Sequence, residues 1–256
     1  MTTAPTLPPS RQPRRGWRAR TRAGWIGLGL ALLCAWVFTL WPGLDLWVAR
    51  LPQAADGHFV GNDWGWVLLL YKTIPAIGWL YFVVGAGAQL LRRVRPGAVS
   101  PRWGRRLAAL MLVSALGSGL LINAGLKEHW GRARPRDVVE LAVPDATAAS
   151  APDRHFSPAL QPTDQCRRNC SFTSGHAASG WVLMAVGLMG PVAVRRRWLA
   201  IGLTTGVLAS AGRILQGGHF LSDTLFSGLI VWGTGWVVRE IWLRVVARRR
   251  ARRPAI

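Results

Sequence analysis

Residues Leu107–Leu126 read LAALMLVSALGSGLLINAGL, twenty residues without a charged side chain. A helix needs about 20 apolar residues to cross the hydrocarbon core of a bilayer. Half of the 256 residues are hydrophobic, and five other apolar stretches have comparable length. These stretches lack amphipathic alternation, which disfavours the alternative of a soluble helical protein with an apolar core. We therefore predict an all-α fold, a bundle of six transmembrane helices at Ala23–Trp41, Trp66–Leu91, Leu107–Leu126, His176–Val194, Trp198–Gln216 and His219–Leu243.

The chain is expected to form one domain, residues 23–243, between two basic cytoplasmic tails, residues 1–22 and 244–256. The first tail is expected to be disordered, because its Thr- and Pro-rich start cannot build a core. A basic start before an apolar run also resembles a secretory signal, but no clear cleavage site follows it, so an uncleaved first span is favoured. The fourth and fifth spans are separated only by Arg195–Arg197, which predicts a tight hairpin there.

The net charge of +21 is unevenly distributed. Of the 32 Lys and Arg residues, six lie in residues 1–22, six in residues 92–106, three in residues 195–197 and six in residues 244–253. With six spans, these four segments all fall on one side of the membrane. The positive-inside rule assigns that side, and both termini, to the cytoplasm. Basic segments beside anionic headgroups explain the charge, so no nucleic-acid partner is expected.

Three polar clusters stand at the edges of apolar runs, and the first is Lys127–Pro135, KEHWGRARP. If the helix continues past Lys127, Arg134 lies two turns further on, about 10 Å away, and both cations can hold one anion. Pro135 would then end the helix and fix Arg134. For Arg132, the alternative of a long cation reaching toward headgroups is at least equally good.

The second cluster, Thr173-Ser174-Gly175-His176, begins the fourth span. Thr173 or Ser174 is a natural N-cap, and Gly175 lets a ligand approach the backbone amides. The first turn of a helix is a ready anion site, from which His176 can donate a proton. Taken alone, this cluster is better explained as a capped helix with an incidental interfacial histidine.

The third cluster runs from Gly212-Arg213 to His219 and Asp223. Residues four apart share a helix face, so Asp223 is expected to accept a hydrogen bond from one ring nitrogen of His219. The other nitrogen is then available as a nucleophile. A purely structural His–Asp pair is the alternative. On six spans, all three clusters lie on the side opposite the arginine-rich segments.

The pattern K-x6-R-P, S-G-H and R-x5-H-x3-D resembles the type 2 phosphatidic acid phosphatase superfamily, which is related to vanadium haloperoxidases and bacterial acid phosphatases. Within it, residues 169–177 are similar to lipid A phosphatases. Two positions depart from the family pattern: Thr173 stands where Pro is usual, and Gly212 where Ser is usual. We expect Thr173 to cost little, since it can still cap the helix, and Gly212 to affect rate or substrate preference.

The resemblance implies that His219 attacks phosphorus, Asp223 orients it, and His176 protonates the leaving oxygen. It implies a phosphate site formed by Lys127, Arg134, Ser174, Gly175 and Arg213. No metal or other cofactor is expected, since the family needs none and the chain offers no carboxylate cluster.

The expected substrate is a membrane lipid phosphate, and the expected location is a bacterial inner membrane with the site facing the periplasm. Lipid A, phosphatidic acid and phosphatidylglycerol phosphate fit this position. A polyprenyl diphosphate phosphatase, a lipid phosphotransferase and a non-catalytic lipid-binding or transport protein stay open as alternatives, as does the oligomeric state. The two outer cysteines, Cys166 and Cys170, are consistent either with a disulfide or with free thiols.

Overall fold

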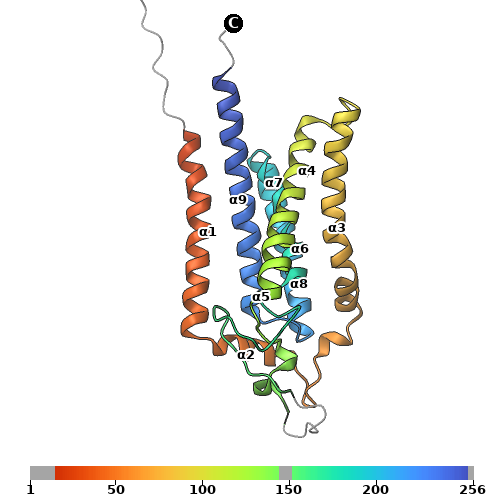
Figure 1. Cartoon of the computed structure of the whole chain (residues 1–256), viewed down its shortest axis with the longest axis vertical. Helices are drawn as coiled ribbons and strands as arrows, with labels where there is room; N and C mark the ends of the chain where they lie inside the picture. Colours follow the sequence, from red (N-terminus) through yellow and green to blue (C-terminus); the bar gives the residue numbers. More distant parts are fainter. Residues whose placement is uncertain (1–14, 144–151, 253–256) are drawn as a thin grey trace, which may run out of the picture.

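The computed structural model describes residues 15–143 and 152–252, and Figure 1 shows their arrangement. The described residues form helices and loops with two isolated β-bridges and no strand, which confirms the all-α prediction. The α-helices are α1 (Arg15–Leu40), α2 (Gly43–Arg50), α3 (Gly65–Val94), α4 (Pro101–Val113), α5 (Lys127–His129), α6 (Gly175–Trp181), α7 (Met184–Leu188), α8 (Val192–Leu215) and α9 (Leu221–Ala251). A π-helix, η2 (Ser114–Leu126), joins α4 to α5, and short 3-10 turns occupy η1 (Val60–Asn62), η3 (Pro135–Asp137) and η4 (Val139–Leu141).

Within the described residues, four helices are long and apolar enough to cross a membrane: Gly65–Val94, Pro101–His129, Val192–Leu215 and Leu221–Arg249. A fifth span is counted if α1 and α2, which meet at 87°, form one broken span. The expected span at His176–Val194 corresponds to α6 and α7, a shorter apolar segment that ends at Leu188. The number six therefore stays a prediction.

The hairpin predicted at Arg195–Arg197 was wrong. The chain turns at residues 189–191, and the three arginines lie in the first turns of α8. Gly190 donates a backbone hydrogen bond to Gly187, and Pro191 is the N-cap of α8, a region where its missing N–H costs nothing.

The bounds of the membrane domain and of the two basic tails stay predictions, but the long helices do not end at them. Helix α1 begins at Arg15 and α9 continues to Ala251, so both helices extend into the segments expected to be tails. The prediction for the Thr- and Pro-rich start, residues 1–14, lies outside the described residues.

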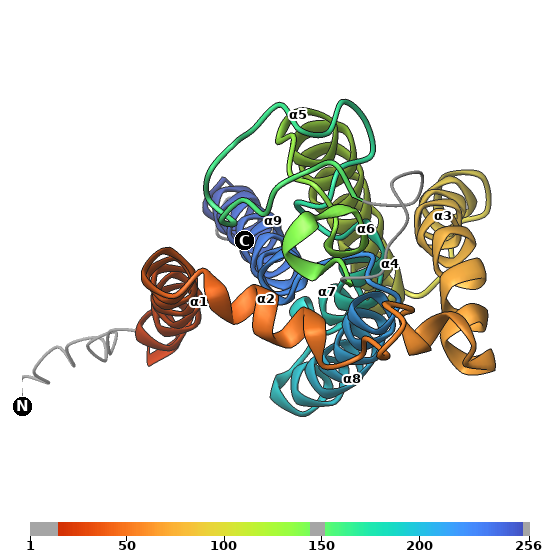
Figure 2. The same cartoon turned by 90° about the horizontal axis from the view of Figure 1, so that it is seen from below.

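The bundle has two chemically different ends (Figure 1). The start of α1, the α3–α4 connection, the α7–α8 turn and the end of α9 lie at one end, which carries the arginine-rich segments. Helix α2, α5 and the loop before α6 lie at the other, which we call the site end. Figure 2 shows α2 crossing this end from α1 toward α8. The polar residue Asp45 of α2 is buried.

Candidate active site

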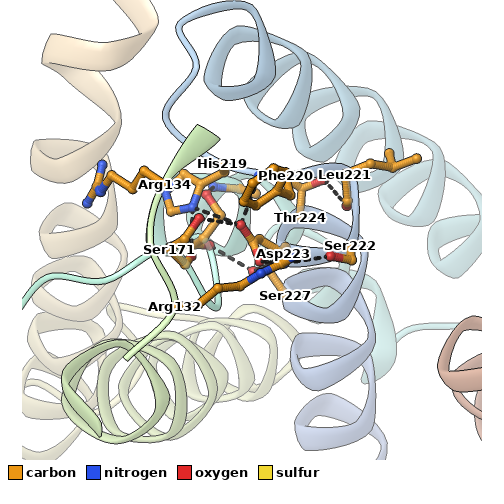
Figure 3. A network of polar contacts seen from close by, with 12 residues as sticks. Arg132, Arg134, Ser171, His219, Phe220, Leu221, Ser222, Asp223, Thr224 and Ser227 are labelled. Carbon is orange, nitrogen blue, oxygen red and sulfur yellow. Dashed lines mark hydrogen bonds and ion pairs between the residues drawn. The ribbon is translucent and has the colours of Figure 1, made fainter. Parts of the chain in front are cut away.

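Asp223 lies at the centre of a buried polar network at the site end (Figure 3). It is in the first turn of α9 and is 0% exposed. Its Oδ1 accepts a hydrogen bond from Arg132 at 2.6 Å, and its Oδ2 accepts from the Ser171 hydroxyl at 2.5 Å and the Phe220 amide at 2.8 Å. These donors satisfy both oxygens of a carboxyl group that is removed from water.

His219 lies beside Asp223 but is not hydrogen-bonded to it, which corrects the expected pairing. Its Nδ1 is 2.7 Å from the Ser171 carbonyl oxygen and 3.7 Å from Asp223 Oδ2. A carbonyl only accepts, so Nδ1 carries the proton and Nε2 carries the lone pair. The ring is 1% exposed, and no hydrogen-bond partner for Nε2 is present in the described chain. The correction arises because α9 begins at Leu221, so His219 precedes the helix.

The first cluster does not continue as a helix to Arg134. The helix ends at His129, Gly131 adopts a φ of 73°, and Arg134 is extended. Pro135 begins a 3-10 turn rather than ending the helix. Arg134 is buried and donates to the carbonyl and side-chain oxygens of Asn169 at 2.7 and 3.0 Å.

Arg132 is the residue that sequence reasoning missed. It does not reach toward headgroups: it is 0% exposed and its guanidinium is 4.3 Å from the ring centroid of Phe220. It donates to Asp223, to Asp45 at 2.8 Å and to the Ser157 carbonyl at 2.8 Å. The sequence pattern gave no signal that separated this arginine from its neighbours.

The second cluster forms the start of α6. Ser174 is the N-cap, and its hydroxyl accepts from the Ala177 amide at 3.3 Å. Thr173 therefore does not cap the helix, contrary to expectation, and its hydroxyl has no partner in the described chain. A Cβ on Gly175 would run into the Asn123 side chain, so only glycine fits there without movement.

His176 is half-buried in the first turn of α6. Its ring stacks on Tyr71 of α3, with the centroids 5.2 Å apart, and its Nε2 is 3.2 Å from the Tyr71 carbonyl oxygen. Because that oxygen can only accept, Nε2 carries a proton in this conformation.

Arg213 is buried in the last turn of α8, close to His219. Its guanidinium donates to Gln216 Oε1 at 2.5 Å and stands 4.9 Å from the ring centroid of Tyr71, while its Nε has no partner in the described chain. A buried guanidinium with an unused donor is suited to an anionic ligand.

The cations gather around His219 and act on its ionisation. Burial lowers the pKa of His219 well below its usual value, and the charges of Arg213, Arg134 and Lys127 lower it further. Burial, followed by the charge of Arg136, also lowers the pKa of Arg134. The positive potential thus keeps His219 neutral and favours a bound anion.

An apolar groove of about 790 Å³ leads away from this cluster. Lys127 and His176 line it together with residues of α3 and η2, among them Ile74, Gly78, Trp79, Phe82, Ala115 and Gly119. Trp79 is 73% exposed, so the groove reaches the surface of the helical bundle. Its lining is suited to a hydrocarbon chain attached to the anion.

The loop before α6 contains a disulfide between Cys166 and Cys170, which resolves the two alternatives left by the sequence. Asn169, the partner of Arg134, lies inside this short ring. Among residues 15–143 and 152–252, no group of three or more His, Cys, Asp or Glu side chains is placed to hold a metal ion.

Residues 108–247 match the PAP2 superfamily, and the chain belongs to it. The fold and the match define a membrane protein of the phosphoric-ester hydrolase class, a lipid phosphatase.

Three similar proteins are all named lipid A 4'-phosphatase. The protein of Francisella tularensis subsp. novicida (strain U112) is 30% identical over 85% of this chain and 95% of its own length. That of Rhizobium etli (strain CFN 42) is 29% identical over 79% and 82%, and that of Rhizobium leguminosarum 36% identical over 75% and 84%. No solved structure matched the chain.

Proposed function

We propose that this protein removes a phosphate monoester from a membrane lipid through a phosphohistidine on His219, without a metal, at the periplasmic face of a bacterial inner membrane. One observation carries the proposal: Nδ1 of His219 is fixed by a carbonyl, while Nε2 is unpartnered and lies among the positive charges of Lys127, Arg134 and Arg213. A neutral nucleophile in a positive pocket is what attack on a phosphate dianion requires.

The first step forms the phosphoenzyme. Nε2 of His219 attacks phosphorus, the N–P bond forms, and the ester P–O bond breaks. The three cations and the amides at Ser174 and Gly175 stabilise charge on the phosphoryl oxygens. The leaving oxygen takes a proton from His176 in its imidazolium form, and we assign this proton to Nδ1 because the Nε2 proton faces the Tyr71 carbonyl.

The second step returns the enzyme. Water attacks phosphorus and gives a proton to His176, the N–P bond breaks, and its electron pair returns to Nε2 of His219. Inorganic phosphate leaves. In both steps Asp223 acts through its negative charge beside the ring, since its hydrogen bonds go to other donors.

We assign the 4'-phosphate of lipid A as the substrate. The apolar groove beside Lys127 and His176 supports a substrate with hydrocarbon chains, and three similar proteins carry lipid A 4'-phosphatase as their name. The opposite position of the arginine-rich end supports a periplasmic site, because basic segments favour the cytoplasmic side.

The test is phosphate release from purified protein in detergent, with lipid A, phosphatidic acid, phosphatidylglycerol phosphate and undecaprenyl diphosphate offered separately. We expect preference for lipid A, insensitivity to EDTA, and loss of release in His219→Ala. His155→Ala is the matched control, because that side chain is exposed. Release by His219→Ala at the wild-type rate would exclude the nucleophile, and full inhibition by EDTA would exclude the metal-free mechanism.

A further inference from the structure

Helix α2, which crosses the site end, contributes a carboxylate to the network around Asp223. Asp45 lies in the first turn of α2 and is 1% exposed. Its Oδ2 accepts from Arg132 at 2.8 Å and from the Ser222 hydroxyl at 2.5 Å, and its Oδ1 accepts from the Ser222 amide at 2.9 Å. Residue 45 precedes the segment that matches the PAP2 superfamily, which begins at residue 108.

The buried charges in this network do not cancel. One guanidinium, that of Arg132, faces two carboxylates, Asp45 and Asp223, and all three are at most 1% exposed. Burying three charges is costly, and a single Arg–Asp pair would be the cheaper arrangement. Burial raises the pKa of Asp45, while the charge of Arg132 and the hydrogen bonds from Arg132 and Ser222 act in the opposite direction. With both carboxylates ionised the network carries one net negative charge; without Asp45, Arg132 would neutralise Asp223.

We propose that Asp45 is a positioning residue for the reaction: it takes up the charge of Arg132, so that Asp223 keeps an effective negative charge beside His219. The proposal rests on the proposed role of His219 as nucleophile.

The chemical step explains why that charge matters. Nδ1 of His219 keeps its proton against the Ser171 carbonyl, so attack by Nε2 makes the ring positively charged. Asp223 Oδ2 is 3.7 Å from Nδ1, in a site without exposed surface. At that distance and at low dielectric, a net negative charge stabilises the phosphoimidazolium more than the neutral ring of the free enzyme.

Two variants of Asp45 separate charge from shape. Asp45→Asn keeps the shape and removes the charge, whereas Asp45→Glu keeps the charge and changes the length. A structural role predicts that the asparagine variant is the more active of the two. The charge role predicts the opposite order. Asp63→Asn is the matched control. The Asp63 side chain is exposed, and its ion pair with the exposed His58 contributes little to stability.

The experiment measures the rate of acid-labile phosphoenzyme formation from labelled lipid in a single turnover, together with kcat, KM and thermal unfolding in detergent. For Asp45→Asn we expect phosphoenzyme formation and kcat to fall about 10- to 100-fold, with KM changed by less than about threefold. Asp45→Glu should retain more activity than Asp45→Asn, and Asp63→Asn should match the wild type.

Wild-type rates in folded Asp45→Asn, or a folded Asp45→Glu that is slower than Asp45→Asn, would overturn the proposal. If Asp45→Glu does not fold, the phosphorylation rate of Asp45→Asn decides alone. Failure of the underlying mechanism looks different: a wild-type enzyme that releases phosphate without forming an acid-labile phosphoenzyme contradicts the role of His219, whatever the Asp45 variants do.

Discussion

Replacement of Gly218 by alanine tests the position of Arg213 without touching a charged residue. A Cβ on Gly218 would lie 2.7 Å from Cζ of Arg213 and closer still to Nη2. Carbon atoms pack at about 3.5–4.0 Å, so the guanidinium must move by about 1 Å. The fold can absorb this, because the atom that must move is at the end of a flexible side chain.

The expected loss is therefore in catalysis rather than in stability. A shift of about 1 Å in a group that holds the reacting phosphoryl costs about 100-fold in rate, which corresponds to about 2.7 kcal/mol in the activation barrier. The thermal stability should change less, because a guanidinium that moves by about 1 Å can keep donating to Gln216; complete loss of that charge-assisted hydrogen bond would cost about 1.5–3 kcal/mol.

Gly212→Ala is the matched control. A Cβ there meets only Val67 Cγ1, at an ordinary 3.7 Å, and Gly212 lies within helix α8. We expect wild-type kcat and a slight gain in stability, because alanine is a better helix former than glycine. Kinetics of phosphate release and unfolding in detergent should be compared for both variants. A Gly218→Ala enzyme with wild-type kcat and KM would refute the assignment of Arg213 to the phosphoryl group.

Three further predictions concern the loop and the nucleophile. Gly131→Ala should lower the free energy of unfolding by about 1–3 kcal/mol, since Gly131 has a φ of 73° and a Cβ would meet the Thr163 carbonyl. Thermal unfolding measures this, and Gly43→Ala is the control because a Cβ at Gly43 would enter open space. The ring of His219 should stay neutral as the pH falls through 6.5 and protonate only in more acid solution, because its pKa is lowered. ¹⁵N NMR of the imidazoles measures this, with His219→Gln to assign the signal, and a titration of that signal near 6.5 would contradict the prediction. Reduction of the Cys166–Cys170 disulfide should raise KM several-fold and lower kcat by a smaller factor, because it loosens the segment that holds Arg134. Unchanged kinetics after verified reduction would contradict the inference that the disulfide supports Arg134.

The sequence predicts those features that depend on local composition. Long apolar runs gave α3, the α4–α5 span, α8 and α9, because a span is recognised by length and hydrophobicity alone. Ser174 as N-cap follows from a preference that acts within three residues. The side on which the clusters gather follows from counting spans, and the structure places them together at the end opposite the arginine-rich segments.

Two predicted boundaries were wrong because glycine and proline residues end or begin the helices at other positions than expected. The helix after Lys127 ends at His129 because Gly131 adopts a positive φ, and the hairpin forms at Gly190-Pro191 rather than at the three arginines. Gly and Pro were visible signals in both places. Charged side chains, by contrast, are compatible with a helix end or a helix interior near the membrane surface.

Arg132 could not have been separated from Arg134 or Arg136 by any local rule. Its partner Asp45 did give a signal, because it stands between Leu44 and Leu46, and a lone carboxylate in an apolar segment needs a cation. The 87° bend between α1 and α2 determines which arginine pairs with Asp45. It places Asp45 against Arg132, a residue 87 positions later in the chain. Sequence periodicity describes one helix at a time and contains no information on that bend. A buried carboxylate within an apolar helix such as α2 therefore predicts that a buried arginine pairs with it, and only the packing of α2 against the start of α9 identifies that arginine.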